Sequence, residues 1–364
     1  MRDNPVKTRI AAGGHAFGAM IFEFFTPGIA QICKAAGAEF ILFDMEHTAV
    51  STETLRQQMA LCRGLGIAPY VRVPAAEYDF IARMLDVGAM GIMVPMVDTA
   101  EQAAFIASCC RYPPVGRRGA AFGVAHDDFE PGPVLDKIQR ANERTLVICQ
   151  IETAVGAQNC DSIAAVPGVD VLWVGHFDLT NFMGIPGQFD HPRYLEAVDA
   201  VVAACDRHGK TPAFMASDRK WMQDYLGKGF RLMAYGLDIS IFQNALAEGI
   251  GFMREQAAAV PTAAPAPAAA PRSRARVKAG AVPKPVEQAA AGANVEKPAA
   301  GANVEKAAAG AKAVARAGAG TGTRAKALGK AGAKAGPGAK AGVKAGPAAK
   351  AGAKPAATRS RSGK

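Results

Sequence analysis

Eight short apolar runs are spaced along roughly the first two thirds of the chain, and segments with helical periodicity lie between most of them. Because the runs are apolar throughout rather than alternating, each predicts a strand buried on both faces, as in a parallel sheet. The runs cover residues 19–24, 40–44, 68–73, 91–97, 145–151, 169–175, 211–214 and 231–235. Helices are predicted over 52–63, with Ser51 as the cap, and over 99–111 and 191–208. Eight strands with helices between them predict an α/β fold, a (β/α)8 TIM barrel. A doubly wound open sheet is the alternative, but no GxGxxG follows the first strand to support it.

The composition changes at about Ala257, where the chain becomes rich in Ala, Gly, Pro and Lys. Residues 257–364 hold 20 of the 42 Lys and Arg but 3 of the 32 Asp and Glu, which gives this segment a formal charge of +17. The remainder carries −7, so the total of +10 describes neither part. We therefore predict a barrel domain over 1–256, large enough for one core, and a disordered basic tail over 257–364.

The seven cysteines all precede the tail and form no CxxC or CxxH pair. Because the number is odd and most of them flank apolar runs, we expect buried free thiols in a reducing compartment. The polar start of the chain and the absence of a long uncharged apolar run favour a cytoplasmic protein without a membrane anchor.

Polar residues, most of them ionisable, cluster where the predicted strands end. In a TIM barrel these ends share one rim, and that rim carries the active site. The residues are Glu23, Asp44, Glu46, His47, Arg72, Gln150, Glu152, His176, Asp178 and Asp238.

Two of these carboxylates, Glu152 and Asp178, end neighbouring strands. Together they would suit a hard divalent cation such as Mg²⁺ or Mn²⁺, with Co²⁺ as a third candidate and with open positions for water and substrate oxygens. The alternative is a pair of capping or salt-bridging carboxylates.

Three further residues on the rim predict acid–base chemistry. His47, oriented by Asp44 or Glu46, would be a general base near neutral pH, and Arg72 offers a planar fork for a carboxylate or a developing enolate. Their alternatives are a histidine bonded to a loop carbonyl and a salt bridge at the mouth. His176 lies directly before the loop with Asp178 and is a weaker candidate for substrate contact.

These motifs together resemble one known family. The stretches FDMEHT, VRVP, GIMVPMVDTAEQA, RYPPVGRRG and QIET, followed by VG..DL....G.PG, are similar to those of the HpcH/HpaI aldolases, the metal-dependent class II pyruvate aldolases. The resemblance runs from about Gly13 to Phe252. It implies a TIM barrel that reversibly cleaves 4-hydroxy-2-oxo acids, of the 4-hydroxy-2-oxoheptanedioate or 2-keto-3-deoxy sugar acid type, to pyruvate and an aldehyde. It also implies a homohexamer with C-terminal helices on neighbouring subunits, and a role in aromatic compound catabolism.

The resemblance assigns roles residue by residue. Glu152 and Asp178 match the metal ligands, Arg72 matches the arginine that stabilises the enolate, and His47 matches the base with Asp44 beside it. Substrate contacts fall on Gln150, on Arg72 and on the backbone of Phe177 and Asp178. Two departures bear on the aldehyde: His176-Phe177 replaces a family Pro-x, and the first strand reads GAMIFEFF, which adds Glu23.

Two other functions remain open from the sequence. One is a carbon–carbon lyase of the citrate lyase β-subunit type that acts on CoA thioesters. The other is a barrel scaffold whose basic tail binds nucleic acid non-specifically through phosphate neutralisation. The tail carries no interleaved aromatic residues, which argues against base stacking.

Overall fold

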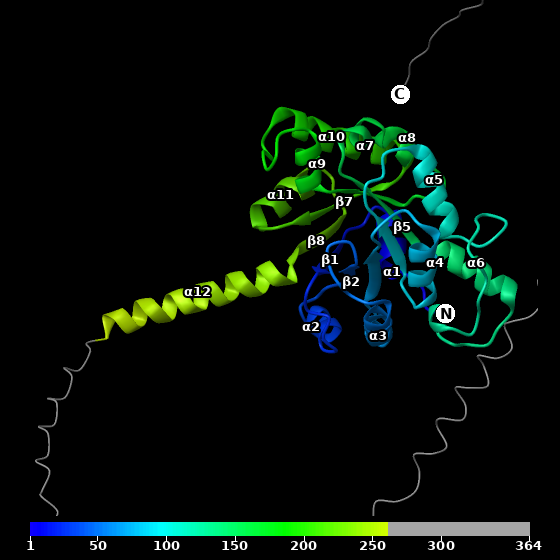
Figure 1. Ribbon diagram of the computed structural model, residues 1–364, viewed down its shortest axis with the longest axis horizontal. Helices are drawn as coiled ribbons and strands as arrows, with labels where there is room; N and C mark the ends of the chain where they lie inside the picture. Colours follow the sequence, from blue (N-terminus) through cyan, green and yellow to red (C-terminus); the bar gives the residue numbers. More distant parts are fainter. Residues whose placement is uncertain (261–364) are drawn as a thin grey trace, which may run out of the picture. The chain divides into compact units, whose positions relative to one another are not determined.

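A computed structural model describes residues 1–260 of this protein, and the predicted tail lies outside the described residues from 261 onward. Eight parallel strands close into a barrel in chain order, which confirms the predicted fold (Figure 1). The strands are β1 Ala16–Ile21, β2 Phe40–Asp44, β3 Ala68–Arg72, β4 Gly91–Val94, β5 Leu146–Ile151, β6 Val171–Val174, β7 Thr211–Ala216 and β8 Leu232–Leu237.

Helices surround most of the barrel. They are α1 Pro5–Ala11, α2 Ile29–Ala35, α3 Thr52–Arg63, α4 Tyr78–Asp86, α5 Ala100–Cys109, the 3-10 turn η1 Ala125–Asp127, α6 Val134–Arg144, α7 Ala154–Gln158, α8 Cys160–Ala164, α9 His176–Phe182, α10 Pro192–His208, α11 Arg219–Gly227 and α12 Asp238–Ala259. Among the helices of residues 1–260, none is long and apolar enough to cross a membrane.

The predicted bounds of β2 and α3 agree with the structure. Ser51 caps α3 by accepting the Thr54 N–H at 3.1 Å, as the sequence indicates. The prediction for β1 was displaced, because this strand covers Ala16–Ile21 and the apolar residues after it belong to a loop. Helix α12 continues to Ala259, past the boundary predicted at 256.

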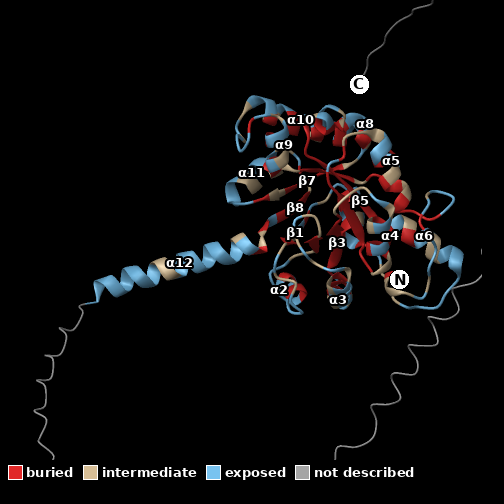
Figure 2. Ribbon diagram, in the orientation of Figure 1, coloured by how far each residue is buried: buried red, intermediate tan, exposed pale blue. Residues whose placement is uncertain are grey.

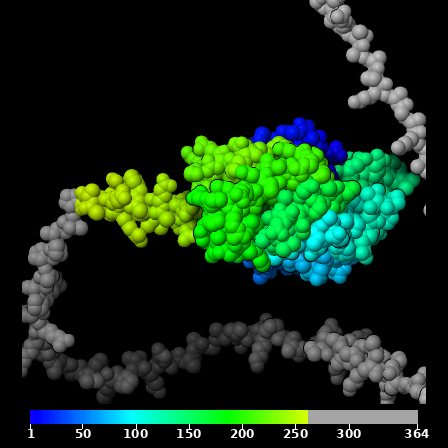
Figure 3. Space-filling model, turned by 90° about the horizontal axis from the view of Figure 1, so that it is seen from above, coloured from blue at the N-terminus to red at the C-terminus, as the bar shows by residue number. Residues whose placement is uncertain are grey.

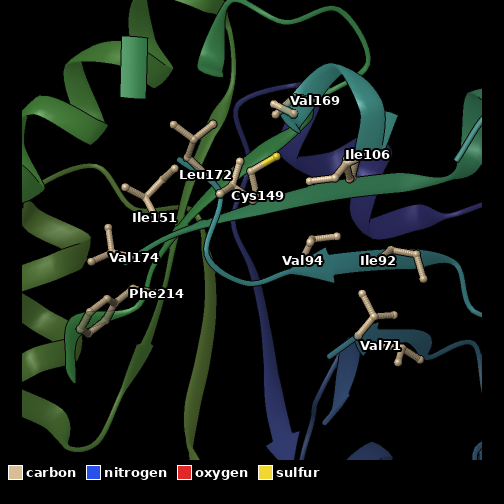
Figure 4. Close-up of a cluster of buried hydrophobic side chains, with 14 of the residues drawn as sticks. Val71, Ile92, Val94, Ile106, Cys149, Ile151, Val169, Leu172, Val174 and Phe214 are labelled. Carbon is tan, nitrogen blue, oxygen red and sulfur yellow. The ribbon is translucent and has the colours of Figure 1, made fainter. Parts of the chain in front are cut away.

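Two apolar layers hold the barrel together. Alternate strand residues such as Phe40, Tyr70 and Trp173 fill the interior, and the other residues pack outward against the helices. Figure 4 shows part of the outer layer, in which Ile92, Cys149 and their neighbours meet Ile106 of α5. All seven cysteines are buried and free, as predicted.

Helix α12 leaves the barrel instead of covering it (Figures 1 and 3). Only its first residue, Asp238, is buried, and almost all of the helix is exposed (Figure 2). Its exposed side chains include large apolar ones, namely Ile239, Ile241, Phe242, Leu246, Phe252 and Met253. Beside its base, an apolar groove of about 810 Å³ runs along β1 and α2, and Phe17, Ile32 and Tyr235 are among its lining residues.

Candidate active site

The strand register brings two oppositely charged side chains together at the mouth of the barrel. Asp44 and Arg72 are register partners at the ends of β2 and β3, and both side chains are buried. The Arg72 Nε donates to Asp44 Oδ1 at 2.5 Å, and Arg72 Nη1 lies 3.1 Å from Glu46 Oε2. Two sides of the guanidinium are therefore fixed by carboxylates.

The third nitrogen of this guanidinium remains free. Among the described residues, buried Arg72 Nη2 has no hydrogen-bond partner. The Phe22 ring lies 5.2 Å from the guanidinium carbon and covers part of it. A buried donor without a partner is costly, so this nitrogen is suited to an anionic oxygen that arrives with a substrate.

Glu152 follows β5 and is 1% exposed. Its Oε1 accepts the backbone N–H of Met96 at 2.7 Å, and its Oε2 accepts from the Gln150 side-chain amide. Met96 adopts a left-handed backbone with φ of 56°, which is unusual for a residue with a side chain. Gly175 lies against the same carboxylate, because a Cβ there would be 2.4 Å from Glu152 Oε2. Glu152 is thus held from three strand ends.

Asp178 lies half-buried in the first turn of α9, and its charge acts on Glu152. Burial, together with the charges of Glu46 and Asp178, raises the pKa of Glu152 to about 7, against the opposing effects of the Met96 N–H and of Arg72. Burial also raises the pKa of Glu46, where Asp44 and Asp178 act in the same direction. Carboxylates that disfavour one another's charge form a place where a cation would be stabilised.

The donor set fits a hard divalent cation with most of its coordination sites open. Within residues 1–260 no group of three or more His, Cys, Asp and Glu side chains is arranged to hold a metal ion. Two carboxylates, with water and a chelating substrate as the other ligands, are the arrangement that Mg²⁺ commonly uses. The unpartnered, buried Gln150 Oε1 is a further oxygen beside Glu152.

Of the two carboxylates that the sequence offers as partners for the His47 imidazole, Asp44 is engaged by other groups. The Asp44 carboxylate is used by Arg72 and by the backbone N–H groups of Glu46 and His47, the latter at 2.8 Å. The imidazole is half exposed, and its Nε2 lies 3.7 Å from Glu46 Oε2. Of the two carboxylates considered, Glu46 is therefore the one near the ring, and Asp44 fixes the backbone turn that carries it.

His176 lies away from solvent in an aromatic cluster. Its ring centroid is 4.6 Å from that of Phe177, 4.9 Å from Phe214 and 5.0 Å from Trp221. Burial alone lowers the pKa of His176 to about 4, so the ring is neutral near pH 7. Its place in the cluster indicates a packing role for α9 instead of substrate contact. Phe177, in contrast, is 60% exposed at the start of α9.

The Asp238 carboxylate binds the backbone of the loop after β1, a contact that the sequence did not predict although Asp238 is among the predicted strand ends. Its Oδ1 accepts the N–H of Phe22 at 3.0 Å, and its Oδ2 accepts those of Glu23 and Phe24 at 2.9 and 2.7 Å. These bonds hold the loop after β1, and with it Phe22 over Arg72. Asp238 and Phe22 are far apart in sequence, and only the closure of the barrel brings them into contact.

The comparisons with known proteins agree with this geometry. The HpcH/HpaI aldolase/citrate lyase family model matches residues 20–245. The chain belongs to the HpcH/HpaI aldolase/citrate lyase family.

Relatives within this HpcH/HpaI family are named aldolases. A hydroxypyruvate/pyruvate aldolase of Cupriavidus necator is 32% identical over 72% of this chain and 96% of its own length. A 5-keto-4-deoxy-D-glucarate aldolase of Klebsiella pneumoniae is 35% identical over 59% and 83%. The crystal structure of an HpcH/HpaI aldolase from Desulfitobacterium hafniense has a TM-score of 0.68 at 29% identity, covering 72% of this chain and all of that one. The predicted enzyme class, a carbon–carbon lyase, is confirmed.

Proposed function

We propose that this protein is a divalent-metal-dependent aldolase that reversibly cleaves 4-hydroxy-2-oxo acids to pyruvate and an aldehyde. The observation that carries the proposal is the buried, unpartnered Arg72 Nη2 at the same barrel mouth as Glu152 and Asp178. A donor for a developing anion and a pair of cation ligands are the two parts that cleavage next to a 2-oxo group requires.

The side chains divide the work as follows. Glu152 and Asp178 would hold a divalent cation, Mg²⁺, Mn²⁺ or Co²⁺, which supplies positive charge beside the 2-oxo acid. His47 accepts the proton of the C4 hydroxyl, with Glu46 beside it to stabilise the imidazolium. The C3–C4 bond then breaks, and its electron pair is delocalised onto the C2 oxygen, to which Arg72 Nη2 donates. Gln150 and the backbone N–H groups of Phe177 and Asp178 would bind the pyruvate part.

The direct test measures pyruvate release from 4-hydroxy-2-oxo acids with Mg²⁺ or Mn²⁺ and then with EDTA. We expect EDTA-sensitive release that is lost in Arg72→Lys, because Lys cannot replace a fork that holds Asp44 and also donates to substrate. Arg83→Lys, on the outer helix α4, is the matched control. Release of acetyl-CoA from a larger CoA thioester, without release of pyruvate from any 2-oxo acid, would favour the citrate lyase alternative instead.

The uncovered parts of α12 and of the barrel support a proposal about assembly. We propose a homo-oligomer, a hexamer as in the resembling family, in which α12 of one subunit covers the groove along β1 and α2 of another. The exposed apolar side chains of both surfaces support this pairing. Light scattering after size exclusion should show smaller species for Phe252→Glu, whereas Glu248→Gln on the same helix should assemble normally.

Most of the tail, from residue 261 onward, lies outside the described residues, so we base the proposed role of residues 257–364 on charge alone. Twenty Lys and Arg against three acidic residues would neutralise nucleic-acid phosphates without reading sequence. A gel shift that weakens steeply with salt, and that disappears when the chain ends at Val260, tests this proposal. Aldolase activity should survive that truncation.

A further inference from the structure

A cavity of about 520 Å³ opens beside the candidate catalytic residues on the β1–β2 side of the mouth. Phe22, Glu23, His47, Thr48, Ser51 and Ile239 are among its lining residues. Two of them connect it to the reacting centre, since Phe22 lies over Arg72 and His47 lies beside Glu46. The cavity therefore adjoins the two residues to which the proposed function assigns the enolate and the base, Arg72 and His47.

The lining combines polar and apolar side chains, with His47 as the proposed base. Hydroxyl groups come from Thr48, Ser51 and Thr54, and the one carboxylate comes from Glu23. Among the described residues that line the cavity there is no lysine or arginine. Within residues 1–260, the Glu23 carboxylate accepts no hydrogen bond and forms no ion pair, so its oxygens are available to a ligand.

Glu23 is held in place by its backbone. Its N–H, together with those of Phe22 and Phe24, donates to the buried carboxylate of Asp238. The loop is therefore anchored at three consecutive residues, and the Glu23 side chain projects from a fixed point on the cavity wall.

We propose that this cavity binds the acceptor aldehyde and that Glu23 makes it selective for neutral hydroxyaldehydes over aldehydes that carry a carboxylate; this inference rests on the proposed aldolase function. The Glu23 carboxylate accepts hydrogen bonds from hydroxyl groups and repels an anion, and no lysine or arginine among the described lining residues compensates. In the addition direction, C3 of the pyruvate enolate bonds to the aldehyde carbon. The carbonyl electron pair moves to the aldehyde oxygen, which takes one proton to become the C4 hydroxyl.

The test compares two acceptors that differ only in CH₂OH against COO⁻, namely glyceraldehyde and tartronate semialdehyde. Full-length protein is given pyruvate, Mg²⁺ and each aldehyde, and the ratio of the two kcat/KM values is measured. We expect at least about a tenfold preference for glyceraldehyde, the scale of one unfavourable charge contact near a protein surface. Comparing the ratio across variants cancels the intrinsic difference in electrophilicity.

Substitutions of Glu23 then test its role directly. Glu23→Gln should lower the preference severalfold, Glu23→Lys should lower it further or reverse it, and Glu23→Asp should restore most of it. The control is Glu53→Gln, an exposed carboxylate on α3 outside the cavity wall, which should leave the ratio unchanged. A ratio that stays constant in folded Glu23→Gln and Glu23→Lys proteins, or a wild type that prefers the anionic aldehyde, overturns the proposal.

A separate measurement distinguishes this proposal from the function beneath it. Exchange of the pyruvate methyl hydrogens for deuterium in D₂O with Mg²⁺ reports enolate formation and needs no aldehyde. If exchange occurs but the acceptor preference is absent or reversed, the role of Glu23 alone is refuted. If neither exchange nor addition occurs, the aldolase function is refuted and the acceptor site with it.

Discussion

Replacing Asp238 by Ala should both destabilise the barrel and loosen the loop that covers Arg72. The carboxylate accepts three backbone N–H groups from residues 22–24, at 2.7 to 3.0 Å, and a further one from Ile239. Because the donors belong to the first and last strand ends, these bonds help to close the barrel between β8 and β1. The substitution therefore removes contacts that no neighbouring residue supplies.

The magnitude follows from the number of bonds. At about 1 kcal/mol for each lost loop bond, Asp238→Ala should lower the free energy of unfolding by about 3 kcal/mol. For a domain of this size that corresponds to a fall in Tm of about 6–12 °C. Asp238→Asn keeps one acceptor oxygen and should fall between the variant and the wild type.

The assay is thermal unfolding followed by circular dichroism at one fixed protein concentration, with aldol kinetics on the same samples. The control is Asp218→Ala, which removes the cap of α11, a single bond to the Trp221 N–H at 2.8 Å; it should cost about 1 kcal/mol. Equal losses for the two variants would refute the reasoning. We also expect Asp238→Ala to free the Phe22 loop and to make the reaction about tenfold slower. An unchanged kcat/KM in this variant would therefore refute the reasoning as well.

Three further perturbations test other parts of the site. His176→Phe should remove an acid sensitivity of the fold. The pKa of His176 in the folded protein, about 4, lies below the ordinary 6.5, so His176 favours folding above pH 6.5, and up to about 3 kcal/mol of folding stability is lost as the pH falls toward 4. Free energies of unfolding from urea titrations that change equally between pH 7 and pH 5 in both proteins would contradict this. Glu152→Gln should abolish the stabilisation that Mg²⁺ gives the wild type, which is about 2.7 kcal/mol at one hundred times Kd and is detected as a rise in Tm. Asp79→Asn on α4 should keep this rise, and a preserved rise in Glu152→Gln would exclude Glu152 as a ligand. Gly175→Ala should lower activity at least about tenfold through displacement of Glu152 and should lower the free energy of unfolding by about 1–3 kcal/mol. Because the φ of Gly175 is −88°, backbone strain cannot explain that loss. Full activity would show that the Glu152 carboxylate tolerates displacement.

Sequence patterns predicted the parts of this fold that local physics determines. The run at 40–44 ends in a charged residue and gave β2 without error, and Ser51 marked the start of α3. The loop after β1 escaped prediction because its apolar residues, including Phe22 and Phe24, extend the strand pattern. They leave the sheet because Asp238, more than two hundred residues away in sequence, binds their backbone.

The candidate site shows the same division between local and long-range information. Strand ends predicted which residues share the rim, but nearness in sequence left Asp44 and Glu46 as alternative partners for His47. The parallel register instead sets Asp44 beside Arg72, and the ionic contact follows from that alignment. The left-handed backbone of Met96 and the apolar surroundings of His176 depend on packing that no short motif encodes.

The aromatic cluster around His176 gives this protein an internal optical probe. The chain has two tryptophans; the Trp221 ring centroid lies 5.0 Å from that of His176, and Trp173 lies on β6, three residues before α9 begins at His176. Trp221 therefore packs against the helix that carries Asp178, and Trp173 lies close before that helix in the sequence. Intrinsic fluorescence, recorded without any label, would follow the arrival of a cation at that carboxylate and separate binding in time from the cleavage that comes after it.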